Sequence, residues 1–230
     1  MHVLRQFLLG SLVICFLLSA PLLWAEDKPL PRVLILSDNI YQQPSREVAK
    51  ELKEKTEVIY IALNPGEVRN TTNVLSDLDR LLGEKPWDLI FFNCGLGDLV
   101  YRAPRMKAFR ILPPEAGGVR TTSPETYQRN LETLVHKLRE SKAKLVWAST
   151  TPIRHSASNV FQLGSEVEYN RIAAAIMKSN QIPICDMYTH VKELIDMDRP
   201  ASHGADPFFF DRKPIHPPII ETIRQQLDLK

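Results

Sequence analysis

Short apolar runs alternate with amphipathic segments along most of this chain. Five runs are continuous enough to be strands buried on both faces: Val33–Leu36, Val58–Ala62, Asp88–Asn93, Lys144–Trp147 and Ile182–Cys185. Other segments carry apolar residues on one helical face: Arg46–Lys55, Asn73–Leu82, a helix opened by Ser123-Pro124-Glu125, Glu166–Asn180, Tyr188–Ile195 and Ile219–Leu227. The alternation predicts one α/β domain, a three-layer α/β/α sandwich with a five-stranded parallel sheet ordered 2-1-3-4-5.

The carboxyl ends of such strands are the part of the fold where ligands bind. The loops after Leu36, Ala62, Asn93 and Trp147 are therefore the places to look for chemistry. The irregular segment Asp198–Pro218 reaches the same edge if the last helix packs back onto the sheet.

The N-terminus has a different pattern from the rest of the chain. Arg5 precedes an almost wholly apolar run, Phe7–Leu23, and Ala25 stands before Glu26-Asp27. This pattern is typical of a secretory signal peptide cleaved after Ala25, which implies export to the periplasm or the medium. Residues 26–31 would then be a linker and residues 32–230 the domain. An uncleaved membrane anchor is the alternative, because the run is close to the length that spans a bilayer.

Composition restricts the function more than it identifies it. The chain has 230 residues, 44% of them hydrophobic and 24% charged, and a formal net charge of +2. This balance gives no indication of a nucleic-acid partner. No histidine pairs with another histidine or cysteine at ligand spacing, and no phosphate-binding glycine motif is present, so we expect neither metal nor cofactor. Cys94 and Cys185 end strands two positions apart in the predicted sheet, which is too far for a disulfide.

Four segments at the predicted strand ends resemble the sequence blocks of SGNH (GDSL-type) hydrolases. They are Ser37-Asp38-Asn39-Ile40 after the first strand, Asn64-Pro65-Gly66 after the second, Gly95-Leu96-Gly97-Asp98 after the third, and the Asp211–His216 region. Further matches to an exported bacterial branch of that family are Tyr127, Asn130-Leu131, Leu145–Pro152, Tyr169-Asn170 and Asp186-Met187-Tyr188. The resemblance implies a flavodoxin-like SGNH-hydrolase fold and a small-molecule ester or carbohydrate ligand. It also implies acyl transfer by serine, histidine and aspartate with an oxyanion hole.

Three positions of that family machinery differ in this chain. Asn39 stands at the serine position, and a neutral amide is not a practical nucleophile. Gly97 stands at the position of the oxyanion asparagine and has no side-chain donor. Lys213 replaces the aspartate three residues before His216, and a nearby ammonium disfavours the imidazolium that the triad must stabilise. Only His216 keeps its role by position.

Ser37 and Asp38 are the candidates nearest to the altered nucleophile position. Two residues of extended chain span about 6–7 Å, so Ser37 needs a shifted turn to reach His216; otherwise it bonds a turn amide as a structural residue. Asp38 matches the family aspartate beside the nucleophile, and its alternative role is to cap the following segment.

Three more residues have both a catalytic and a structural interpretation. Asp211 orients His216 if the chain turns between them, or else is a solvated carboxylate beside Arg212. Asn93 donates to an oxyanion in place of Gly97, or else bonds loop backbone. Gly66 supplies an oxyanion amide, serves a tight turn, or does both.

These observations leave three hypotheses of function. In the first, the protein retains weak or altered ester hydrolysis through Ser37 and His216. In the second, which the chemistry favours, it is a non-catalytic relative that binds a carbohydrate or acyl ligand. In the third, it is an unrelated binding protein of the same architecture. The arginine-rich loop Tyr101–Thr122 is either a solvated loop or a contact for an anionic ligand such as a sugar acid or a lipid headgroup.

Overall fold

The first strand, β1 (Arg32–Leu36), sends alternate side chains into opposite layers of the molecule. Leu34 and Leu36 belong to one core cluster, and Val33 and Ile35 belong to another. All four side chains are fully buried. The continuous apolar run Val33–Leu36 is therefore explained by helices on both faces of the sheet.

The five-stranded sheet of this computed structural model is wholly parallel and has the order β2-β1-β3-β6-β7. The other strands are β2 (Glu57–Tyr60), β3 (Leu89–Phe92), β6 (Lys144–Ala148) and β7 (Ile184–Cys185). The predicted order 2-1-3-4-5 is thus confirmed. The structure describes residues 29–61, 70–106, 110–158, 160–200, 210 and 213–229.

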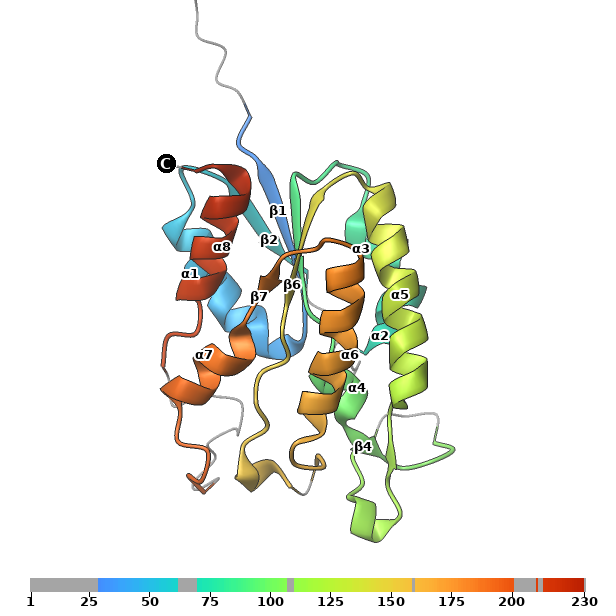
Figure 1. Ribbon diagram of the computed structural model, residues 1–230. Coiled ribbons are helices and arrows are strands. Elements are labelled where there is room, and N and C mark those ends of the chain that lie inside the picture. The colour runs from blue at the N-terminus through green and yellow to red at the C-terminus, as the bar shows by residue number, and fades with distance from the viewer. Residues whose placement is uncertain are drawn as a thin grey trace, which may run out of the picture.

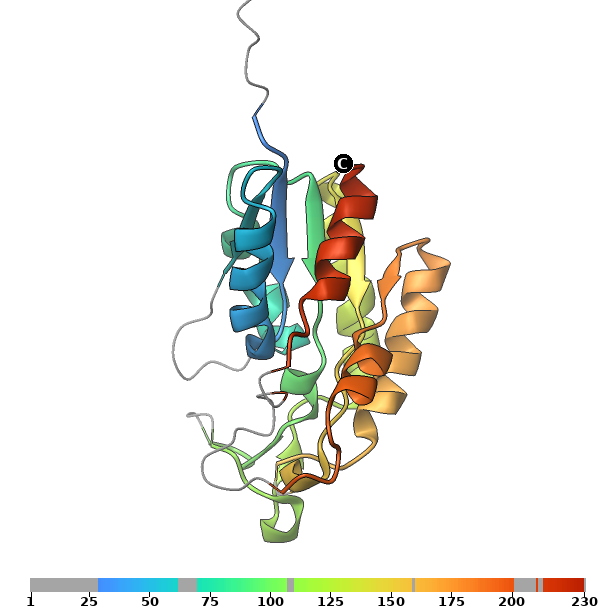
Figure 2. The same cartoon turned by 90° about the vertical axis from the view of Figure 1, so that its left-hand side faces the viewer.

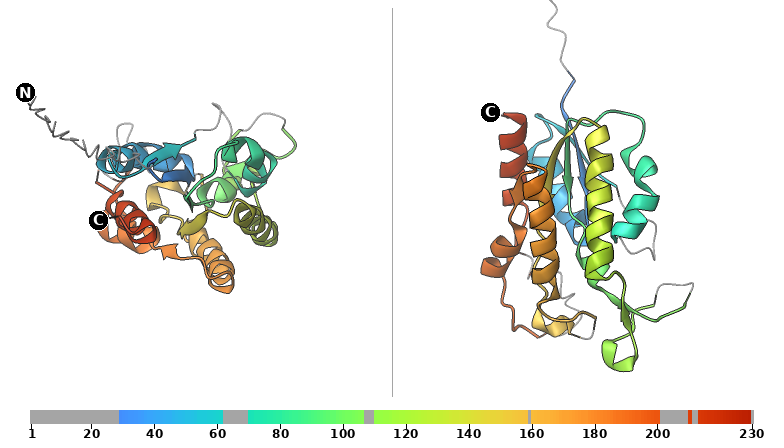
Figure 3. Two further views of the ribbon diagram at one scale, coloured as in Figure 1. Left: turned by 90° about the horizontal axis from the view of Figure 1, so that it is seen from above. Right: turned by 45° about the vertical axis from the view of Figure 1, so that its right-hand side comes forward.

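Helices cover the two faces of the sheet unequally (Figures 1 and 3). The first core cluster lies under α2 (Thr71–Ser76), α3 (Leu78–Leu82), α5 (Pro124–Glu140) and α6 (Ser165–Ser179). The second lies under α1 (Gln42–Glu51), α7 (Met187–Leu194) and α8 (Pro217–Leu227). The whole sheet and both clusters lie within residues 32–229, so this part of the chain contains its own core.

Two helix predictions were wrong in detail. The segment Asn73–Leu82 forms two helices, α2 and α3, because Asp77 leaves the helical conformation (φ −106°, ψ 5°) and pairs its carboxylate with Arg80 at 2.5 Å. The first helix begins at Gln42 rather than Arg46, after a 3-10 turn η1 (Asn39–Tyr41), and the Ser45 hydroxyl donates to the Tyr41 carbonyl in its first turn. The cap at Ser123 was predicted correctly, since its side chain accepts from the Thr126 amide.

The described part of the arginine-rich segment, residues 101–106 and 110–122, contains a small hairpin and is called the arm below. It pairs β4 (Tyr101–Arg102) antiparallel with β5 (Val119–Arg120), and a 3-10 turn η2 (Pro114–Ala116) lies between them. The arm projects beyond the ends of the main strands (Figures 1 and 3). The sequence prediction of a plain loop was therefore wrong, as was the omission of the short helix α4 (Leu96–Leu99).

The two cysteines of the described chain are buried thiols on opposite sides of the sheet. Cys94 belongs to the first core cluster and Cys185 to the second. None of the helices in the described ranges is long and apolar enough to cross a bilayer. The predicted signal segment and residues 26–28 of the predicted linker lie outside the described residues.

Leu34 offers a direct test of this core. It lies opposite Ile59 on one side and Ile90 on the other, with its side chain fully buried. We expect Leu34→Ala to lower the free energy of unfolding by about 2–5 kcal/mol, because the cavity cannot close between two paired strands. Leu30→Ala, at a side chain that is 43% exposed, is the matched control and should change it by less than about 0.5 kcal/mol in urea denaturation. Equal effects of the two variants would contradict this placement.

Candidate functional site at the carboxyl edge of the sheet

The turn that leaves β1 places its three polar residues in different environments. Ser37 is fully buried and Asp38 is 3% exposed, whereas the side chain of Asn39 is exposed. The cause is the 3-10 turn η1, in which the Tyr41 amide donates to the Asp38 carbonyl and the Tyr41 ring packs into the second core cluster. Because Tyr41 turns inward, Asn39 at the start of the same turn points to solvent.

The Asp38 carboxylate is the main link between this turn and the loop after β3. It accepts hydrogen bonds from the amides of Gly95 (3.1 Å), Leu96 (2.9 Å) and Gly97 (3.3 Å). The Asp38 side chain does not cap η1, the segment that follows it. It accepts instead from the amides at the start of α4. Gly97 therefore directs its backbone amide to Asp38, in addition to having no side-chain donor.

No residue larger than glycine fits at position 95, because Thr150 occupies the space of a side chain. A Cβ atom built there would lie 1.8 Å from the Thr150 hydroxyl oxygen. Thr150 is itself fixed by Asn170, whose amide oxygen accepts from the Thr150 amide (2.7 Å) and whose nitrogen donates to the Thr150 carbonyl (2.9 Å). The loops after β3 and β6 are thus in direct contact.

Asn93 is fully buried beneath the same loops. Its amide nitrogen donates to the Ala148 carbonyl at 2.8 Å and approaches the Thr150 hydroxyl at 3.4 Å. These contacts hold the end of β6, so Asn93 has the structural role considered for it, which is to bond loop backbone. The remaining side-chain atom is an oxygen, which cannot donate to an oxyanion.

His216 ends the segment that leads into α8. The helix begins at the carboxyl edge and runs back along the sheet (Figure 2). Its neighbour Ile215 packs in the second core cluster, against which Ile40 of the β1 turn also packs. His216 and the β1 turn therefore lie at the same edge of the sheet. The imidazole of His216 is partly exposed.

The remaining predicted site residues add little to this geometry. Lys213 is exposed. Gly66 and Asp211 lie outside the described residues, so their proposed roles stay predictions. Among the residues that are described, no group of three or more His, Cys, Asp or Glu side chains is arranged to hold a metal ion.

Sequence analysis overlooked Asp98, a buried carboxyl group at this edge whose pKa is raised. It is fully buried, and burial raises its pKa from 3.8 to about 6, although hydrogen bonds from Thr71 oppose the shift. Thr71 donates its hydroxyl at 2.6 Å and its amide at 3.0 Å, and Asn130 donates in turn to the Thr71 hydroxyl at 3.0 Å. The only available signal was the place of Asp98 in the third block.

A buried tyrosine pair completes the support of the edge. The rings of Tyr127 and Tyr169 lie 4.7 Å apart, and their hydroxyls donate to the carbonyls of Cys94 (2.8 Å) and Thr122 (2.5 Å). Burial, with a smaller contribution from the charge of Asp98, raises the pKa of Tyr127 well above its usual value. Both phenols therefore act as hydrogen-bond donors that fix loop backbone rather than as proton acceptors.

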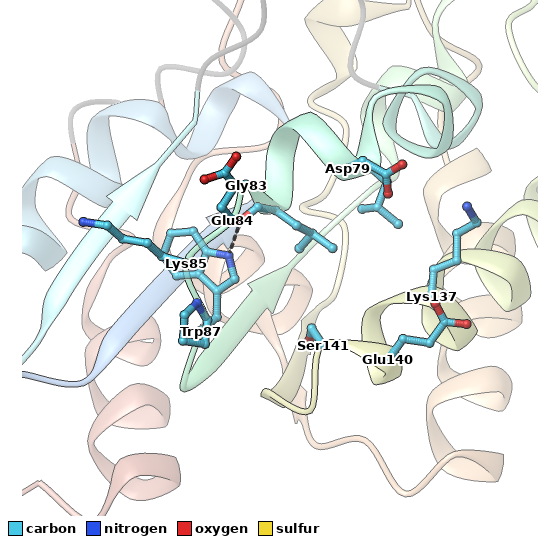
Figure 4. Close-up of a pocket in the computed structure, with 11 residues that line it drawn as sticks. Asp79, Gly83, Glu84, Lys85, Trp87, Lys137, Glu140 and Ser141 are labelled. Carbon is cyan, nitrogen blue, oxygen red and sulfur yellow. Dashed lines mark hydrogen bonds between the residues drawn. The ribbon is translucent and has the colours of Figure 1, made fainter.

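Two further features lie near the sheet but do not extend the site. His155 Nδ1 lies 2.5 Å from Asp198 Oδ1, but the side chains are 54% and 85% exposed, so the pair is open to water. A pocket of about 260 Å³ lies at the opposite edge, between the loop before β3 and the end of α5 (Figure 4). Its Trp87 indole donates to the Leu82 carbonyl at 2.7 Å, and its walls mix lysines with acidic residues.

Comparison with solved structures identifies the fold. A lipase/acylhydrolase from Enterococcus faecalis has a TM-score of 0.57 at 15% identity, covering 86% of this chain and 97% of its own. A GDSL-like lipase from Bacteroides thetaiotaomicron has a TM-score of 0.57 at 14% identity, covering 86% and 87%. An acetylxylan esterase from Geobacillus stearothermophilus has a TM-score of 0.57 at 11% identity, covering 88% and 96%. No protein-family model and no curated protein matches the sequence.

The architecture is therefore the α/β fold of the SGNH hydrolases, as the sequence resemblance implied. At these identities the likeness concerns the fold.

Removing the Asp38 carboxylate tests the link between the two loops. Asp38→Ala leaves three buried amides without their acceptor, so we expect a loss of about 3 kcal/mol or more in the free energy of unfolding. Asp38→Asn keeps one acceptor and should lose less. The control is Asp79→Ala, at an exposed residue of α3. Its free energy of unfolding in the same urea titration should stay within about 0.5 kcal/mol of that of the parent protein. An Asp38→Ala variant as stable as the control would refute the link.

The raised pKa of Asp98 predicts a specific pH dependence of stability. Between pH 4 and 6 the folded protein holds the proton more tightly than the unfolded chain, so this group's contribution to stability falls as the pH rises through that range. Relative to Asp98→Asn, which cannot titrate, the wild type should gain on the order of 3 kcal/mol when the pH falls from 7 to 4. Urea denaturation across this range measures the difference, and parallel curves for the two proteins would exclude a raised pKa.

Proposed function

We propose that this protein descends from SGNH ester hydrolases and binds an acyl or carbohydrate ester ligand at the carboxyl edge without cleaving it through Ser37. The single observation that supports the proposal is the exposure of two residues in the β1 turn, Ser37 and Asn39. The hydroxyl-bearing Ser37 is fully buried, and the exposed position of the turn belongs to the amide of Asn39.

The chemistry available at the edge agrees with binding. Asn39 offers one donor pair and one acceptor to a ligand, and the partly exposed His216 offers a donor or an acceptor according to its protonation. An amide does not attack an ester, and a histidine alone does not form a covalent acyl intermediate of the serine type. The groups that remain are suited to hydrogen bonds with ester or sugar oxygens.

The fold supports the ligand class without deciding the substrate. Solved structures with this fold carry names such as acetylxylan esterase, lipase and acylhydrolase. We therefore propose acetylated sugars or short acyl esters as the ligand. We also propose export through the segment at residues 1–25, which implies that the ligand is met outside the cytoplasm.

Retained hydrolysis through Ser37 and His216 is the competing hypothesis, because both residues lie at the same edge and His216 is in the family position. For this chemistry the β1 turn would have to rearrange, since a fully buried hydroxyl cannot reach a substrate.

Covalent labelling separates the two hypotheses. We expect residues 26–230 to resist a fluorophosphonate probe and to leave p-nitrophenyl acetate intact, while ligand-observed NMR detects binding of an acetylated xylo-oligosaccharide. Asn39→Ala should weaken that binding about tenfold, the value of one hydrogen bond. Labelling that disappears in Ser37→Ala but persists in the control Ser179→Ala would overturn the proposal in favour of hydrolysis.

The same assay on a restored variant checks the alignment of the blocks. Asn39→Ser, Gly97→Asn and Lys213→Asp combined should create esterase activity and probe labelling if the backbone frame of the family is intact. If the folded triple variant stays inert and the parent protein binds no acetylated sugar, the placement of the site at this turn is wrong.

A further inference from the structure

The arm is a preformed surface rather than an irregular loop. Arg102 lies between two chain segments, paired with Val119 in the β4–β5 ladder and with Ile111 in an isolated bridge. The Ala103 amide donates to the Arg110 carbonyl at 2.8 Å, which continues the pairing. Gly118 permits the closure, because a Cβ atom there would lie 1.8 Å from the Leu112 carbonyl oxygen.

One face of the arm is anchored to the domain. The Tyr101 amide donates to the Val160 carbonyl at 3.0 Å, and Arg120 donates to the Gln162 side chain at 2.5 Å. The Arg120 guanidinium also lies 5.7 Å from the rings of Tyr101 and Tyr169. Tyr101 and Arg120 are cross-strand partners, so their side chains share this inner face.

The opposite face of the arm combines positive charge with exposed aliphatic side chains. Arg102 and its two partners share this outer face, and Ile111 and Val119 are 48% and 44% exposed. Exposed Arg105, Met106 and Arg110 follow in the same segment, with Met106 44% exposed. Three of the seven large hydrophobic residues that are exposed in the described chain thus lie in the arm.

The charge of the arm departs from that of the whole chain. Its described residues contain four arginines (Arg102, Arg105, Arg110, Arg120) and one acidic residue, Glu115. The complete chain is nearly balanced, with 29 basic and 27 acidic residues. A positive excess confined to one projecting hairpin indicates an anionic partner.

From this juxtaposition of Arg102 with exposed Ile111 and Val119 we infer that the outer face of the arm docks on an anionic lipid surface. Arginines attract anionic headgroups, and aliphatic side chains gain only by entering an apolar phase. A sulfated or acidic polysaccharide would satisfy the arginines but leave the aliphatic side chains in water. The arm projects from the carboxyl edge, so docking would bring the candidate site close to the lipid surface (Figure 1). This inference does not depend on whether the site cleaves or binds its ligand.

Vesicle co-sedimentation tests the inference on residues 26–230, which omit the apolar N-terminal run and retain the whole sheet and both core clusters. We expect binding to vesicles with 30% phosphatidylglycerol, no binding to pure phosphatidylcholine, and loss of binding at high salt. Arg102→Gln, Arg105→Gln and Arg110→Gln combined should weaken binding by more than tenfold, at about fivefold per arginine. The matched control removes the same charge from α5 and α6 by Arg129→Gln, Arg171→Gln and Lys178→Gln, and should bind like the parent.

A second variant separates lipid from polysaccharide. Ile111→Ser with Val119→Ser keeps every arginine and should reduce vesicle binding severalfold while leaving retention on a dextran sulfate column unchanged. Circular dichroism shows whether each variant is folded. Three results would overturn the inference: binding to dextran sulfate without vesicle binding, no binding to either, or equal vesicle binding by the arginine variant and its control.

Discussion

One buried carboxylate determines how the carboxyl edge is assembled. Asp38 follows β1, and its carboxylate accepts hydrogen bonds from the amides of Gly95, Leu96 and Gly97 in the loop after β3. Buried amides need acceptors, so this contact fixes the loop. It also satisfies the first amides of α4, whose own N-cap residue makes no side-chain hydrogen bond. The contact also determines the direction of the β1 turn, because a carboxylate turned inward at Asp38 leaves Asn39 facing out.

The residues that carried the family resemblance are mostly the ones that hold this edge together. Tyr127 donates to the Cys94 carbonyl, Asn130 to Thr71, and Asn170 makes two hydrogen bonds with Thr150. Asp186 accepts from Ser149 and Thr189, and these hydrogen bonds hold its pKa below the usual value although partial burial opposes ionisation. The segments that resemble the family blocks thus form a hydrogen-bonded loop scaffold at this edge.

The sheet was predictable because its strands contain continuous apolar runs and are separated by helices with a clear apolar face. Burial at the β1 turn was not predictable, since Ser37, Asp38 and Asn39 are all polar, and their exposure is set by the inward packing of Tyr41 and the contact of Asp38 with the loop after β3. The break at Asp77 depends on its pairing with Arg80, and the hairpin of the arm depends on the close approach of Gly118 to Leu112. Neither feature leaves a periodic pattern in the sequence. Asp98 was missed because its neighbours in space, Thr71 and Asn130, are distant in sequence.

The polar groups at this edge differ in whether their hydrogen-bonding capacity is already used. Asp38, Asn93 and the amide of Gly97 are committed to hydrogen-bond partners within the protein, so a ligand could recruit them only by breaking those bonds. Among the predicted site residues that the structure describes, Asn39 and His216 are the ones whose side chains reach solvent at this edge. A site whose accessible groups are an amide and an imidazole can hold an ester by hydrogen bonds but has no accessible hydroxyl from the β1 turn with which to attack it. The proposed binding function therefore depends on the exposure of the side chains at this edge more than on the identity of the motif.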